Sequence, residues 1–216
     1  MNKIIALLLV AVMALSLAAC STTTPAETTG TTAAVETTVD TTPTETTVDT
    51  TPVETTEGAV AAAENAASKV LNNIWAQYPE DFKAMFMGGD YNNMVNAAPG
   101  VATEQDFIIS SLLVPETEAG NISEAASVLH MNANTFTGAA YVLAEGADQA
   151  AFVAAVQTAI QGNHWMCGMP DSLLIAKADS AIIVVFGKTD AMDPFQTALT
   201  TAYAEAEILV NEAIGG

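Results

Sequence analysis

The chain has 216 residues, half of them hydrophobic, and a formal net charge of −20, with five lysines and no arginine. Nucleic acids are bound through clusters of basic side chains, so this charge argues against nucleic-acid binding. It also argues against electrostatic attachment to an anionic membrane surface, which leaves a hydrophobic anchor as the route to a membrane.

The first twenty residues predict export and lipid anchoring. Lys3 precedes an apolar run from Ile4 to Leu15, an order typical of a secretory signal peptide. The run to Ala19 is shorter than the roughly 20 residues that a membrane-spanning helix needs. Leu17-Ala18-Ala19-Cys20 resembles the lipobox of bacterial lipoproteins. The resemblance implies cleavage between Ala19 and Cys20 and a diacylglyceryl group on the Cys20 thiol. We therefore expect a palmitate-type lipid anchor on the outer face of the cell membrane.

Residues 21–58 predict a disordered tether. Eighteen of these thirty-eight residues are threonine, seven are acidic, and none is basic or aromatic. A nine-residue repeat starts at Glu36 and again at Glu45. Such a segment cannot bury enough apolar surface to offset the entropy lost on ordering. We expect three parts: a signal peptide over 1–19, the lipidated cysteine with its tether over 20–58, and one globular domain over 59–216.

The globular part predicts an α+β fold. Apolar residues at helical spacing predict a helix over 60–78, which Pro79 ends. Residues 92–103 predict a loop. The further expected elements, in chain order, are a short helix over 80–86, a strand over 107–114, an element over 123–131 left open between helix and strand, a strand over 136–143, a helix from Asp148 to Gly162, strands over 172–177 and 181–186, and a helix from Asp193-Pro194 through Ala213.

These elements suit an antiparallel sheet of three to four strands with helices packed on one face. The strands over 172–177 and 181–186 are so close in sequence that they predict a hairpin. The run 181–186 has the strongest β propensity and predicts a central strand. Together with the strand over 136–143 and the helix that follows it, this hairpin indicates a split β-α-β unit.

This outline also resembles a family of uncharacterised lipoprotein domains from Gram-positive gut bacteria. The resemblance rests on the lipobox, on the acidic threonine-rich linker, and on the helix–hairpin–helix region from Asp148 to Ala213. It implies no catalytic residues, because the function of that family is unknown.

One loop carries unusual chemistry. His164, Cys167 and Met169 lie within six residues, and such soft ligands suit Cu(I). His130 and Met131 could join them from elsewhere in the chain. The favoured interpretation is packing, in which Trp165 and Met166 fill the core and Cys167 is a small buried hydrophobe. A reactive or intermolecular thiol is a third possibility, because lipidation of Cys20 leaves Cys167 without a partner.

No recognisable catalytic motif occurs: there is no phosphate-binding glycine loop, no nucleophile elbow, no zinc-protease helix and no EF-hand loop. We therefore expect a non-enzymatic, surface-anchored module without a cofactor, which binds a protein, a wall component or a small ligand. The alternative is a soft-metal-handling or thiol-dependent envelope protein that uses Cys167.

Overall fold

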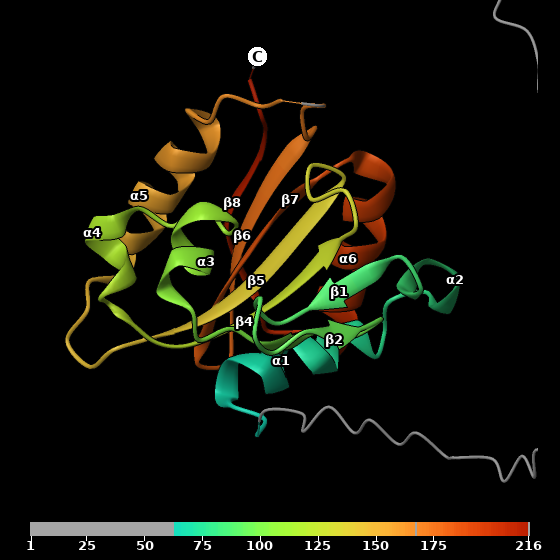
Figure 1. The fold of residues 1–216 in the computed structure, drawn as a ribbon, viewed down its shortest axis with the longest axis horizontal. Coiled ribbons are helices and arrows are strands. Elements are labelled where there is room, and N and C mark those ends of the chain that lie inside the picture. Colours follow the sequence, from blue (N-terminus) through green and yellow to red (C-terminus); the bar gives the residue numbers. More distant parts are fainter. Residues whose placement is uncertain (1–62, 167, 216) are drawn as a thin grey trace, which may run out of the picture. The chain divides into compact units, whose positions relative to one another are not determined.

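The computed structural model describes residues 63–166 and 168–215 (Figure 1). The predictions for the signal peptide, for Cys20, for the tether and for Cys167 lie outside these residues. Among the residues that the structure describes, no helix combines the length and the apolar character needed to cross a membrane.

A mixed α+β fold with an antiparallel sheet is confirmed. The sheet has eight strands in the order β2-β1-β4-β5-β7-β6-β8, and β3 pairs with β4 beside this path. The strands are β1 (Phe86–Gly88), β2 (Val95–Asn96), β3 (Gly100–Val101), β4 (Ile122–His130), β5 (Phe136–Leu143), β6 (Ser172–Ala178), β7 (Ala181–Gly187) and β8 (Glu207–Ala213). The helices are α1 (Ala66–Trp75), α2 (Glu80–Lys83), α3 (Gln105–Ser110), α4 (Glu116–Ala119), α5 (Gln149–Gln161) and α6 (Thr189–Ala202).

The prediction of three to four strands is wrong. Strands β2 and β3 have only two residues each and lie in the expected loop over 92–103. Two residues are too few to show the alternation of apolar and polar side chains that predicts a strand. Strand β1 begins at Phe86, the last residue of the expected helix over 80–86, of which only α2 forms. The element over 123–131, left open before, is strand β4.

Helices cover both faces of the sheet, so the prediction of a single covered face is also wrong (Figure 1). Helices α1 and α6 bury their apolar sides in one core, and α3, α4 and α5 bury theirs in the other. The topology explains this arrangement. The crossovers β5-α5-β6 and β7-α6-β8 run toward the same edge, but β5 and β7 are antiparallel. If both crossovers have the usual right-handed sense, their helices must lie on opposite faces.

The expected split β-α-β unit is confirmed, because β7 lies between β5 and β6 and is antiparallel to both. The hairpin of β6 and β7 and the interior position of β7 are confirmed as well. Helix α5 begins as predicted: the Asp148 side chain accepts hydrogen bonds from the backbone N–H groups of Ala150 and Ala151, and Gly162 caps the other end.

Two element predictions fail because a short apolar pattern does not decide between helix and strand. The run over 107–114 overlaps helix α3 instead of forming a strand, and this helix buries Phe107 and Ile108 in the second core. The last helix begins at Thr189 instead of Asp193, so Pro194 lies inside it, and it ends at Ala202. The segment expected to continue this helix is strand β8, which pairs along β6.

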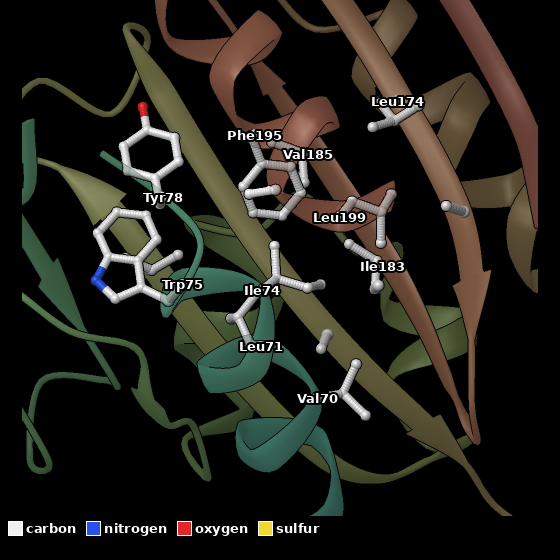
Figure 2. Close-up of a cluster of buried hydrophobic side chains, with 14 of the residues drawn as sticks. Val70, Leu71, Ile74, Trp75, Tyr78, Leu174, Ile183, Val185, Phe195 and Leu199 are labelled. Atoms are coloured by element: carbon white, nitrogen blue, oxygen red, sulfur yellow. The ribbon is translucent and has the colours of Figure 1, made fainter. Parts of the chain in front are cut away.

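The first core is built from α1, α6 and the strands between them. Figure 2 shows Leu71 and Ile74 of α1 directed toward side chains of β7 and α6, among them Ile183 and Phe195. Trp75 stacks on Tyr78 with the ring centroids 4.5 Å apart. The Tyr78 hydroxyl donates to the carbonyl oxygen of Ala191, and burial together with nearby Asp190 raises the pKa of Tyr78 to about 12. This core holds the β1–β4 corner of the sheet in place through Phe86.

Candidate ligand-binding groove

Methionines gather at the corner of the sheet where β1 lies between β2 and β4. Met87 is directly opposite Leu129 of β4 and opposite Asn96 of β2. One step further, the backbone N–H of Met131 donates to the carbonyl oxygen of Met85 at 3.0 Å. Alternate residues of a strand share a face, so this register places Met87, Leu129 and Met131 on the same side of the sheet.

Two adjoining hollows open on this side, and together we call them the methionine groove. The first has a volume of about 210 Å³ and the second about 310 Å³. They share the lining residues Ser111, Leu129 and Ala133, so the two hollows are neighbours. Met87, Tyr91, Met94 and Met131 line the first hollow, and Asn134, Thr137, Trp165 and Phe186 line the second.

Helix α3 supplies one wall of the groove. The Tyr91 ring meets Phe107 edge to face, with the centroids 5.1 Å apart, and the Tyr91 hydroxyl is 3.0 Å from Oγ of Ser111. These contacts fix one edge of the Tyr91 ring, although the residue as a whole is 66% exposed. Tyr91 therefore presents a held aromatic surface to solvent at the mouth of the first hollow.

Asp90 organises the loop that carries Tyr91 and Met94. The residue is 2% exposed, and its carboxylate accepts backbone hydrogen bonds from Asn92, Asn93, Thr103 and Glu104. Burial by itself raises the pKa of Asp90, but the hydrogen bonds from Thr103, Glu104 and Asn92 outweigh burial and lower it. The carboxylate is therefore ionised at neutral pH.

Two glycines bring the backbone of this loop close to its neighbours. Gly89 has a φ of +83°, and a Cβ placed on it would lie 1.9 Å from the carbonyl oxygen of Asn93. A Cβ on Gly88 would lie 2.2 Å from the carbonyl oxygen of Ala98. Sequence reasoning missed this site. The signal was the sequence Gly88-Gly89-Asp90-Tyr91-Asn92-Asn93, which is typical of a turn closed by an aspartate side chain.

The other end of the groove contains the loop that the sequence singled out. Trp165 packs against Phe186 with the centroids 5.4 Å apart, as the packing interpretation expects. Met166 does not fill the core, because it is 78% exposed. Nδ2 of Asn134 donates to the carbonyl oxygens of Met166 and Gly168 at 2.6 and 2.7 Å and so attaches this loop to the β4–β5 turn.

The structure describes two of the three predicted metal ligands. His164 is exposed, Met169 packs against the second core, and Cys167 lies outside the described residues. A metal site at His164, Cys167 and Met169 therefore stays a prediction. In the described part of the chain, no three side chains of His, Cys, Asp or Glu form a group that could hold a metal ion.

His130 borders the first hollow, but its ring faces the other side of the sheet. The ring lies edge to face with Phe86, which belongs to the first core, at 5.3 Å. Its Nδ1 accepts a hydrogen bond from the backbone N–H of Asn132 at 3.0 Å. This hydrogen bond puts the proton of the neutral ring on Nε2, so His130 acts as a donor rather than as a metal ligand in this arrangement.

No protein-family model matches the chain, and comparisons with curated proteins and with solved structures also give no match.

Proposed function

We propose that the protein is a non-enzymatic binding module that is held by lipid on Cys20 at the outer face of the cell membrane and binds its ligand in the methionine groove. The observation that carries this proposal is where the exposed apolar side chains lie. Tyr91, Met94 and Met131 line the first hollow and are 66%, 54% and 72% exposed. Met85, half exposed, pairs with Met131 through the backbone.

Exposed apolar residues gathered around a hollow typically mark a binding surface, whereas single ones scattered over a protein need no explanation. Methionine suits such a surface because its unbranched side chain adapts to ligands of different shape. In the groove these flexible side chains stand beside the held ring of Tyr91. The combination favours a ligand with apolar groups.

The groove offers little for acid–base or nucleophilic chemistry. Asp90 and His130 supply the carboxylate and the imidazole among the residues that border the first hollow, and the Tyr91 hydroxyl there is hydrogen-bonded to Ser111. The Asp90 carboxylate is occupied by the loop around it, and the His130 ring lies against Phe86. The second hollow is lined by uncharged residues. These contacts support a binding role over a catalytic one.

The proposed tether gives this module reach. As a flexible coil, residues 21–58 would span roughly 30–40 Å, and a fully extended chain could approach ~120 Å. Seven acidic residues and the prolines favour the extended end of this range. The domain could therefore meet a protein, a wall component or a small ligand well away from the membrane to which Cys20 is attached.

Binding of the uncharged apolar dye Nile red tests the groove as a ligand site. Ala133 is exposed and borders both hollows, so Ala133→Glu adds a charge to the groove without disturbing a core. We expect Ala133→Glu to weaken dye binding at least fivefold. Ala154→Glu is the matched control, because Ala154 is exposed on helix α5 and lines neither hollow. Equal dye binding by the two variants, or none by the unchanged protein, would contradict the proposal.

A further inference from the structure

If the methionine groove is the ligand site, as proposed above, its first hollow also has the chemistry to select one class of ion. We infer that Met87, Met94 and Met131 form a binding site for a soft monovalent cation, Cu(I) or its analogue Ag(I), in the first hollow. The three methionines come from three different segments of the chain: strand β1, the loop before β2, and the end of β4.

The fold places three methionines around one hollow. All three methionines line a hollow of about 210 Å³. Met87 and Met131 share a face of the sheet by register, since Met87 is opposite Leu129 and Met131 follows two residues later. Met94 precedes Asn96, the partner of Met87 on β2, by two residues and so continues the same face. A side chain as flexible as methionine can adjust its sulfur to a shared ion.

The donor atoms select the kind of ion. Neutral thioethers are soft ligands that favour Cu(I), whereas Ca²⁺ and Mg²⁺ require several oxygen ligands. The carboxylate at the hollow, Asp90, cannot supply them, because both of its oxygens already accept hydrogen bonds from residues 92–104. A hard divalent ion would therefore lose its hydration in a mostly apolar hollow without replacement.

Charge favours a cation at this position. Asp90 lies buried at the edge of the hollow as an ionised carboxylate without a basic partner among the residues that the structure describes. The whole chain carries a net charge of −20, which raises the local concentration of cations around it. The attraction is long-range, while the sulfur atoms provide the selectivity.

The site differs from the one that the sequence suggested. The soft-ligand class is the same, but the residues are not His164, Cys167 and Met169. Met166, the most exposed methionine in the described chain at 78%, lines neither hollow and serves as the internal control.

Titration with Ag(I) and Cu(I) tests the inference directly. The chain from residue 20 onward, with Cys20→Ala and Cys167→Ser to remove both thiols, is titrated with silver nitrate by calorimetry. Cu(I) is added anaerobically in competition with the chromophoric chelator bicinchoninate. We expect one ion per chain. The triple variant Met87→Leu, Met94→Leu, Met131→Leu should bind at least tenfold more weakly, and Met166→Leu should bind as before.

Leucine keeps the apolar volume and removes only the sulfur, so this series separates metal binding from packing. Far-UV circular dichroism and the melting temperature report whether the triple variant folds. If it does not, the single variant Met131→Leu, at an exposed position, should still weaken binding at least threefold. An absence of binding by the parent chain, or unchanged affinity in the folded Met→Leu variants, would overturn the inference.

The two proposals fail in different ways. Ala133→Glu should weaken Nile red binding but leave the affinity for Ag(I) within twofold or increase it, since it adds a negative charge. The triple leucine variant is judged by its affinity for Ag(I) alone, because its three positions also line the groove in which the dye would bind. If Nile red binding fails its test while Ag(I) binding passes, the apolar groove is contradicted. If Ag(I) binding fails its test while Nile red binding passes, the metal site is contradicted.

Discussion

At the scale of single residues, Asp90 is the side chain on which the groove depends most. Its carboxylate joins the turn after β1 to the segment after β3 through backbone hydrogen bonds from both. A buried carboxylate is stable only when its lone pairs are satisfied, and here the loop satisfies them. The loop that carries Tyr91 and Met94 is therefore shaped by one acid rather than by a regular element.

Asp90→Asn should lower the free energy of unfolding by about 2–3 kcal/mol at pH 7. One carboxylate oxygen is replaced by an NH₂ group, which cannot accept the hydrogen bonds that the loop N–H groups donated to that oxygen. The pKa of Asp90 is lowered in the folded protein. Its stabilising contribution is thus complete above the unfolded value of about 3.9 and is lost as the pH falls through the folded value.

Urea unfolding at pH 7 and pH 3, followed by tryptophan fluorescence, measures this effect. The difference in stability between the unchanged protein and Asp90→Asn should narrow at pH 3. The same difference at both pH values would mean that the Asp90 carboxylate does not hold the loop through its charge.

At the scale of elements, the sequence predicts features that depend on neighbouring residues, such as helix caps and hairpins. It does not predict strands that form only by pairing with a distant segment. Asp148 and Gly162 mark the ends of α5 correctly, because a cap is a contact between neighbours in sequence. The hairpin of β6 and β7 is predicted for the same reason. Strand β8 is missed, since Leu209 and Ala213 also fit a helical period and only pairing with β6 decides the outcome.

Helix α6 gives the clearest test at this scale. Asp193-Pro194 reads as a helix start, yet the structure begins α6 at Thr189 and places Pro194 in its interior. There, Pro194 cannot donate to the carbonyl oxygen of Asp190. Pro194→Ala should therefore raise the free energy of unfolding by roughly 1–2 kcal/mol, since an interior proline costs a helix about 3 kcal/mol and part of this is offset in the unfolded chain.

Asp193→Ala is the companion variant for chemical unfolding. In the interior of α6 the aspartate is exposed and caps nothing, so its removal should leave the free energy of unfolding unchanged or slightly higher. If α6 began at Asp193, the loss of the cap would instead destabilise the protein by about 1 kcal/mol, and Pro194→Ala would bring no gain.

At the scale of the whole molecule, the two crossovers explain why the domain has two cores. The sequence predicts the two crossover helices, α5 and α6. The prediction that helices cover a single face is wrong because it does not take into account that β5 and β7 run in opposite directions. The groove could not be predicted at all. Met87 and Met131 are more than forty residues apart and meet only through the pairing of β1 with β4.

The proposed position of this domain outside the cell rests on one covalent bond, the thioether that the lipobox predicts at Cys20. Two acyl chains would hold the tether at the membrane, whereas a single chain binds only marginally. The groove would then work outside the cell, at the end of its threonine-rich tether. A free Cys20 would leave this arrangement without an anchor.

Mass spectrometry of the protein extracted from membranes with detergent tests this claim most directly. We expect a chain that begins at Cys20 and carries the added mass of a diacylglyceryl group on that residue, and no such mass in Cys20→Ala. A chain that retains residues 1–19, or that begins at another residue with an unmodified Cys20 thiol, would contradict it.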